Sequence, residues 1–278
     1  MPEIENPYYR MMALGACRSI FGYPFDTCLG AIKFAAQANP DNSSFSIIQQ
    51  IARKKGLPGF FNLGLVSFNK RFLKECVRWP VITKIHFELN NRFPQTFSSD
   101  GLAKKLVTAV CVAAFDVGII VPVDQLLAYR AKEEQPYRRF FKTRYSQIGI
   151  RSLYRGAGLH LLNQAMAWSI LLGGDSEAKK LYDHYFQKES NPFFRQAMSS
   201  CVVGVGLTLT ALPVDFVKTR IQMDTNLHNQ KYWTAAKLLK QQFGFRCFYS
   251  GALPVYCHSF LYATVVGWAT ERYLVKKQ

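Results

Sequence analysis

A Pro-x-Asp tripeptide occurs three times in this chain of 278 residues, each time at the end of an apolar run. The copies are Pro24-Phe25-Asp26, Pro122-Val123-Asp124 and Pro213-Val214-Asp215, so that successive prolines lie 98 and 91 residues apart. A single tripeptide would be uninformative, but near-equal spacing along the whole chain is typical of an internal repeat. The sequence therefore predicts three copies of one structural unit.

A second motif follows each tripeptide in the same order. It consists of a glycine, an apolar residue, two variable residues and two further apolar or aromatic residues, in the copies Gly56–Phe61, Gly149–Tyr154 and Gly244–Tyr249. A further glycine follows the later copies, at Gly156 and Gly251. The two motifs divide the chain into three predicted repeats, residues 1–98, 99–190 and 191–278.

Each repeat contains two apolar stretches of helical length. They cover residues 11–36 and 63–89, then 106–128 and 159–174, then 197–217 and 252–269. Segments of about twenty residues are long enough to cross a bilayer as helices, and the proline in the first stretch of each repeat should kink it. Short amphipathic segments, such as 45–53 and 233–243, lie between the stretches. The expected fold is an all-α membrane protein with six transmembrane helices.

Charged residues in the stretch 63–89 constrain how this helix faces its surroundings. Lys70, Lys74 and Arg78 lie four residues apart and therefore share one helix face. A cation that faces lipid at mid-bilayer costs roughly 2.5–3.5 kcal/mol, so three of them would cost on the order of 8–10 kcal/mol. We therefore expect this face to line water.

The composition limits the classes of partner and site. Lys and Arg number 35 against 18 Asp and Glu, giving a net charge of +17, which favours nucleic acid, an anionic lipid surface or an anionic solute as partner. The seven cysteines form no Cys-x-x-Cys pair and the five histidines form no His-Glu-x-x-His pattern. No disulfide framework, metal site or cofactor is therefore predicted. Two acids near the start, Glu3 and Glu5, argue against a cleavable leader.

The third repeat carries the most complete motif. Residues Pro213–Gln222 read Pro-x-acid-x-x-base-x-base-x-Gln, and together with the two degenerate copies they make the chain similar to the mitochondrial carrier family over essentially its whole length. The resemblance implies three pseudo-symmetric helix pairs around a central, water-filled cavity, with short amphipathic helices on the matrix side. It also implies a multi-pass, monomeric protein of the mitochondrial inner membrane that exchanges a solute by alternating access and is not an enzyme.

The resemblance further implies a matrix-side gate in which each acid pairs with a base of the next repeat. The gate residues are Pro24, Asp26, Pro122, Asp124, Pro213, Asp215, Lys218 and Gln222. Members of the family have a base five residues after each motif proline. In this chain Lys218 is such a base and is expected to pair with Asp124, whereas Leu29 and Leu127 occupy the other two positions. Asp26 and Asp215 are expected either to stay hydrated or to find other bases. Lys33 and Arg130, about a helix turn further along, are the candidates.

Solute contacts in the family lie on each second helix, at a fixed distance past the motif glycine. That distance leads to Lys70, to Asn163 with Gln164 beside it, and to His258, while Lys74 and Arg78 extend the Lys70 face. The cationic face favours an anionic solute. A nucleotide is the first choice, and a carboxylate or an amino acid is the alternative. His258 either titrates near neutral pH or is a plain hydrogen-bonding residue.

Two further sets of charged residues have open roles. Arg18 and Asp116, each six positions before a motif proline, either pair across the cavity or face water separately. At the opposite end of the helices, Glu177 and Lys180 fit the family's acid–base motif loosely. Glu88 and Glu271 fit that motif less well.

Tyr154, Arg155 and Gly156 match the pattern with which family members hold cardiolipin at helix N-termini. Free backbone amides there would favour a phosphate. The alternative is that Arg155 merely extends to the membrane interface.

The main alternative to a transporter is a carrier fold that no longer transports and serves as a membrane adaptor. Leu29 and Leu127 favour the adaptor, whereas the cationic face favours transport, since an adaptor has no use for charges that are costly in a membrane. A soluble nucleic-acid binder would need a dense basic patch with interleaved aromatic residues. The charges here are spread over loops and one helix face, so the expected partners are an anionic solute and membrane lipid, and not nucleic acid.

Overall fold

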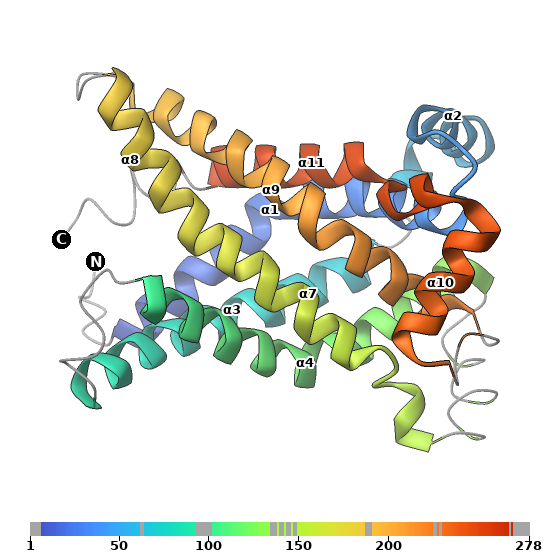
Figure 1. Ribbon diagram of the computed structural model, residues 1–278, viewed down its shortest axis with the longest axis horizontal. Coiled ribbons are helices and arrows are strands. Elements are labelled where there is room, and N and C mark those ends of the chain that lie inside the picture. Colours follow the sequence, from blue (N-terminus) through green and yellow to red (C-terminus); the bar gives the residue numbers. More distant parts are fainter. Residues whose placement is uncertain are drawn as a thin grey trace.

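The computed structural model describes residues 7–61, 64–92, 102–133, 149–186, 191–224 and 230–266, together with the single positions 138, 142, 146, 227 and 268. Every regular element within these ranges is a helix or a helical turn, which confirms the all-α prediction. Figure 1 shows long helical segments that run alternately in opposite directions along the molecule.

Six long segments make up the bundle. They are α1 (Pro7–Ala38), α3 (Gly64–Arg92), α4 (Leu102–Glu133), α7 (Ala157–Ser169) continued through the π-helical turn η4 (Ile170–Gly174) into α8 (Asp175–Phe186), α9 (Pro192–Met223), and α11 (Ala252–Leu261) continued into η6 (Tyr262–Val266). Each segment packs on the next one in the chain, and α11 packs back on α1. The six segments therefore form a closed ring.

Short helices lie at one end of this ring. They are α2 (Ser44–Lys55) and α10 (Tyr232–Phe243), which are followed by the 3-10 turns η1 (Leu57–Phe61) and η5 (Phe245–Tyr249), and a third such turn, η3 (Gly149–Ser152), precedes α7. Figure 1 places α2 and α10 at the end where α1 and α9 finish. Each 3-10 turn coincides with one copy of the glycine–aromatic motif.

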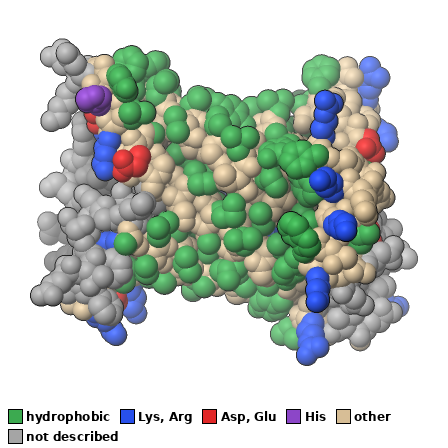
Figure 2. Space-filling view, viewed as in Figure 1, with side chains coloured by type: hydrophobic (Ala, Val, Ile, Leu, Met, Phe, Trp, Pro, Cys, Tyr) green, Lys and Arg blue, Asp and Glu red, His purple; other side chains and the backbone are tan. Residues whose placement is uncertain are grey.

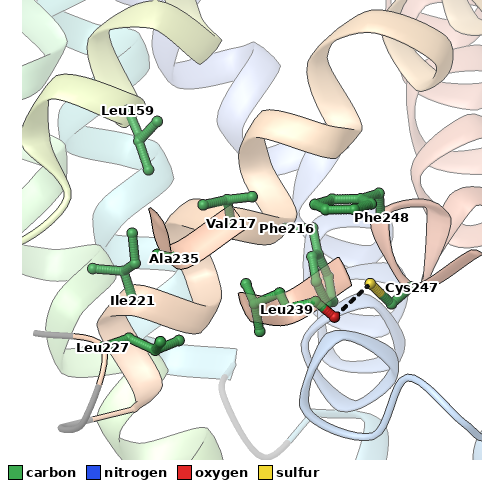
Figure 3. Packing of buried hydrophobic residues seen from close by; sticks show 9 residues of the cluster. All are labelled: Leu159, Phe216, Val217, Ile221, Leu227, Ala235, Leu239, Cys247 and Phe248. Carbon is green, nitrogen blue, oxygen red and sulfur yellow. Dashed lines mark hydrogen bonds between the residues drawn. The ribbon is translucent and has the colours of Figure 1, made fainter. Parts of the chain in front are cut away.

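A buried apolar cluster fixes α10 to the end of α9 (Figure 3). Phe216 of α9 is fully buried and packs edge-on against Phe248, with ring centroids 5.8 Å apart. Leu239 of α10 and Cys247 of η5 complete the same cluster. Burial raises the pKa of the Cys247 thiol, so this cysteine stays neutral and packs as a small apolar residue.

The motif prolines lie inside α1, α4 and α9, as predicted. A proline inside a helix leaves the carbonyl four residues earlier without its usual donor. In α9 the hydroxyl of Tyr249 donates to the carbonyl oxygen of Leu209 at 3.3 Å, and in α4 the hydroxyl of Tyr154 donates to that of Gly118 at 3.2 Å. Both carbonyls are the ones that the prolines set free. The corresponding aromatic of the first motif, Phe61, has no hydroxyl.

The outer surface is apolar along the middle of the bundle. Figure 2 shows one face on which hydrophobic side chains occupy the middle, while Lys and Arg gather toward the two ends. Val110, Val202 and Leu209 are each more than half exposed. Among the described helices, Pro192–Met223 is long and apolar enough to cross a membrane, and the bent pair Leu106–Gly118 and Ile120–Leu126 gives a second candidate span. The other four predicted spans stay a prediction.

The tyrosine hydroxyl on the α9 kink can be tested with a single-atom change. Replacing Tyr249 by Phe leaves the Leu209 carbonyl without this donor, so we expect a loss of about 1 kcal/mol, seen as a melting temperature lower by about 2–4 °C. Intrinsic fluorescence of the detergent-purified protein measures it. Tyr185→Phe, on an exposed α8 side chain, is the matched control. Equal melting temperatures for both variants would mean that the hydroxyl does not support the kink.

Candidate functional site

A cavity of about 620 Å³ lies inside the ring, and all six long segments contribute to its wall. Three sets of charged side chains line it. The ionic network, defined here as Asp26, Lys33, Asp124, Asp215 and Lys218, lies in the halves of α1, α4 and α9 that follow or contain the motif prolines. A second set comes from α3, and the third is Asp175 with Lys179 of α8.

Asp215 of α9 is the most connected member of the ionic network. Its carboxylate lies 2.7 Å from Lys33 Nζ, accepts a hydrogen bond from Gln37 at 2.9 Å, and lies 3.6 Å from Lys218 Nζ. Asn163 of α7 adds a longer hydrogen bond of 3.4 Å. Lys33 thus takes the place of the missing base at Leu29. Leu29 itself packs against an apolar cluster around Ile32 and Ala36.

Asp124 of α4 contacts Lys218, as the sequence predicts. Lys218 Nζ lies 3.0 Å from Asp124 Oδ2, and both side chains are buried. His160 of α7, which the sequence analysis did not assign to the site, lies beside this pair, with Nδ1 3.3 Å from Lys218 Nζ and 3.7 Å from Asp124 Oδ2. The pair is therefore linked to α7 as well as to α4 and α9.

Asp26 of α1 finds its partners on two other helices. Arg71 of α3 and His258 of α11 contact its two carboxylate oxygens. Neither contact was predicted, because the sequence analysis gave Arg71 no role and assigned His258 to the solute. The side chains of Leu127 and Arg130, where the missing base and its proposed substitute fall, lie outside the described residues.

Gln222 lies next to the ionic network, one turn beyond Lys218. Its side-chain amide donates to the carbonyl oxygen of Arg155 at 3.3 Å, and its own carbonyl oxygen accepts a hydrogen bond from Gln125 at 3.2 Å. These bonds connect α9 to α4 and to the turn before α7.

Most of the predicted solute contacts line the cavity. Lys74, Arg78, Asn163, Gln164 and His258 all contribute to its wall, whereas the side chain of Lys70 lies outside the described residues. Asn163 and His258 face Asp215 and Asp26, respectively. These two positions therefore join the cavity to the ionic network.

Of the two alternatives for Arg18 and Asp116, pairing with each other is not found, because Asp116 pairs with Arg78. Arg78 Nε donates to Asp116 Oδ1 at 3.2 Å, Nη2 contacts the second oxygen, and both side chains are buried. The Arg78 guanidinium also lies over the Trp168 ring, 4.8 Å from its centroid. A bidentate pair of this kind neutralises the Arg78 charge and joins α3 to α4 and α7.

Arg18 and Lys74 are the cavity cations with the least carboxylate contact. Among the described side chains no carboxylate lies within ion-pair distance of Arg18, which donates to the Tyr262 hydroxyl at 3.3 Å and stacks 4.5 Å from the Trp79 ring centroid. The carboxylate in contact with Lys74 is that of Glu75, 3.8 Å away, and Glu75 also accepts a hydrogen bond from Trp79 at 2.9 Å. These two cations have donors to offer to an anion in the cavity.

At the other end of the cavity the acid and base differ from those predicted. Asp175 and Lys179 line the cavity 3.0 Å apart, and Ser199 of α9 donates to Asp175 at 2.6 Å. Glu177 and Lys180 pair with each other at 2.8 Å and are exposed, so they do not face the cavity. Glu88 likewise pairs with Arg92 on the surface, and Glu271 lies outside the described residues.

The predicted lipid-binding residues lie at the start of α7. Arg155 is buried, and its guanidinium donates to the carbonyl oxygen of Asp224, at the end of α9. Gly156 adopts φ +78°, a left-handed conformation that favours glycine. Arg155 therefore caps a neighbouring helix and does not extend to the membrane interface.

The buried pair of Arg78 and Asp116 can be tested by a double-mutant cycle. Replacing Arg78 by Met leaves Asp116 buried without its bidentate partner, so we expect a loss of about 3–5 kcal/mol of stability. The double variant Arg78→Met with Asp116→Leu removes both charges and should recover most of that loss. Thermal unfolding in detergent measures both. A double variant as unstable as the single one would contradict a pairing role for Arg78.

Comparisons with known proteins agree with this architecture. The family model described as "Mitochondrial carrier protein" matches residues 189–275. The chain is 23% identical over 261 residues to the glutamate/glycine mitochondrial carrier of Schizosaccharomyces pombe, an alignment that covers 87% of this chain and 84% of that protein.

Two other relatives match shorter parts. The mitochondrial nicotinamide adenine dinucleotide transporter 1 of Saccharomyces cerevisiae is 28% identical over 171 residues, covering 55% of this chain and 45% of that protein. The mitochondrial adenyl nucleotide antiporter of Mus musculus is 30% identical over 115 residues, covering 41% of this chain. The chain spans 24% of the length of this antiporter. Together with the motifs and the helical ring, these relatives make the chain similar to mitochondrial carriers, at low sequence identity.

Proposed function

We propose that this protein is a transporter of the mitochondrial inner membrane that crosses the bilayer six times as three repeats, residues 1–98, 99–190 and 191–278. The closed ring of six long segments, the cavity inside it and the apolar middle of the outer surface (Figure 2) support this arrangement. Four charged residues of α3 that would be costly against lipid face the cavity instead, namely Arg71, Lys74, Glu75 and Arg78. A solute pathway through the ring explains why the chain keeps them.

The ionic network acts as the gate at one end of this pathway. Its contacts join α1 to α9 through Lys33 and Asp215, and α4 to α9 through Asp124 and Lys218. Transport by alternating access requires these pairs to separate when the other end closes. Separation hydrates the charges, which offsets part of the attraction lost between them.

The solute is a small anion held by Arg18 and Lys74, and this pair of incompletely compensated cations is the observation that carries the proposal. Arg18 offers a forked donor and Lys74 a point charge. Aromatic rings of Trp79 and Tyr262 flank the Arg18 guanidinium and shield it from water. A carboxylate or a single phosphate group fits such a site.

The charge balance of the cavity favours a carboxylate or amino acid over the nucleotide predicted from the cationic face. Seven Lys and Arg and five Asp and Glu are found among the described side chains that line it. Asp116, behind Arg78, offsets one more positive charge. The small surplus suits an anion of one or two charges better than a polyphosphate. The relative with the longest alignment is named for glutamate and glycine, while two others are named for nucleotides.

Uptake of labelled solutes into liposomes that contain the purified protein tests this proposal. The panel holds amino acids, di- and tricarboxylates, phosphate and nucleotides, each with and without internal counter-solute. The double variant Arg18→Gln with Lys74→Gln should lower kcat/KM at least about 10- to 100-fold, since each hydrogen bond to a charged group contributes about 1.5–3 kcal/mol. Lys180→Gln, on the exposed face of α8, is the matched control and should leave uptake unchanged.

Each result has a defined meaning. Saturable uptake of an amino acid or carboxylate that the double variant loses supports the proposal in full. Uptake of a nucleotide supports the transporter and restores the first prediction for the solute. No uptake across the panel, from protein shown to be folded, would instead favour the non-transporting adaptor.

A further inference from the structure

The three acids of the ionic network are held across the ring by different chemical groups. Asp215 and Asp124 are each contacted from another helix by a lysine, Lys33 and Lys218, respectively. Asp26 is contacted by Arg71 of α3 and by His258 of α11. Helix α3 is the long segment that follows α1 in the chain, and it packs on α1. Among the described side chains, the group that joins Asp26 to α11 is therefore a histidine, which can gain or lose a proton near neutral pH.

His258 and Asp26 are accessible from the cavity. Both line it, and their side chains keep 32% and 25% of their exposure. Arg71 and Lys74 of α3 are the other charged groups that act on Asp26. The same cavity is also lined by Arg18 and Lys33 of α1 and by Asp215 and Lys218 of α9, the two helices that pack on α11. Water in the cavity can therefore exchange a proton with this pair.

A short chain of contacts leads from the proton-binding histidine to the anion site. The ring of Tyr262 stacks on that of His258, with an interplanar angle of 2° and centroids 6.0 Å apart. The Tyr262 hydroxyl accepts the hydrogen bond from Arg18 at 3.3 Å. An anion that draws the Arg18 guanidinium toward itself would thus move a side chain that packs directly on His258.

We propose that His258 and Asp26 form a proton-binding site that couples solute movement to the movement of one proton. The protonated imidazolium holds the Asp26 carboxylate by charge as well as by a hydrogen bond, and so joins α1 to α11. When the proton leaves to water, the charge attraction is lost and the contact weakens. Because alternating access exposes the pair to each compartment in turn, a proton taken up on one side is released on the other. This inference rests on the proposed function.

A pH gradient across proteoliposomes tests the coupling directly. With a solute that the wild type transports and with the membrane potential clamped at zero, a gradient of one pH unit should drive accumulation up to about tenfold for a singly charged anion. A pH-sensitive dye inside the vesicles should report protons that enter with the solute. His258→Gln keeps an amide donor near Asp26 but cannot carry the proton, so whatever solute exchange remains should be independent of the pH gradient, without gradient-driven accumulation. His184→Gln, exposed on α8, is the matched control.

Two outcomes would overturn the coupling without touching the transporter itself. One is solute uptake by the wild type that ignores the pH gradient, and the other is unchanged gradient-driven accumulation in His258→Gln. If no solute in the panel is transported, the proposed function fails, but the proton site is still testable. Histidine-selective nitrogen NMR of the protein in nanodiscs, assigned with His258→Gln, should show His258 changing protonation between pH 5.5 and 8. A His258 that stays in one protonation state over that range contradicts the site.

Discussion

The charge pairs of Asp215 and Lys218 on α9 hold the ring together at the end where we propose the gate. These two residues, one turn apart on a single kinked helix, contact α1 through Lys33, α4 through Asp124 and α7 through His160. Buried charges are tolerated only when each one is compensated, so three helices must keep their registers relative to α9. These contacts tie α1, α4 and α7 to a single turn of α9.

The same repeated motifs supply both the bend and its supports. Each proline lies inside a long helix and frees a carbonyl, and in two repeats the motif tyrosine donates to that carbonyl. The residue after each motif tyrosine donates to a carbonyl near the end of the proline-containing helix of the neighbouring repeat in the ring. Arg155, after Tyr154, donates to the Asp224 carbonyl at the end of α9. Ser250, after Tyr249, donates to the Ala36 carbonyl near the end of α1 at 3.2 Å. The first repeat has Phe61 at the tyrosine position, so α1 lacks a hydroxyl from this motif.

Sequence spacing predicted the helical class and the three long helices with an internal proline, because these depend on regular motifs. The contact of Lys218 with Asp124 followed from the family resemblance. The partners of Asp26 were not predictable, since Arg71 and His258 come from elements that no periodicity links to it. The loose assignment of the family's acid–base motif to Glu177 and Lys180 was wrong for a local reason. A π-helical turn at Ile170–Gly174 shifts the helix register, so the residues that face the cavity are Asp175 and Lys179. Asp175 and Lys179 are four residues apart, a spacing typical of an ion pair on a helix. This spacing is the sequence feature from which their pairing could have been predicted.

Transport through this ring requires the contact between α1 and α9 to break and re-form in every cycle. A double variant with Lys33→Cys and Asp215→Cys, in a chain whose seven native cysteines are replaced, places a cross-linkable pair at that contact. Uptake into liposomes is measured before and after a short bifunctional thiol reagent, and again after reduction. The gate described here predicts uptake that stops on cross-linking and returns on reduction. Uptake that continues at the same rate with the cross-link formed would contradict it.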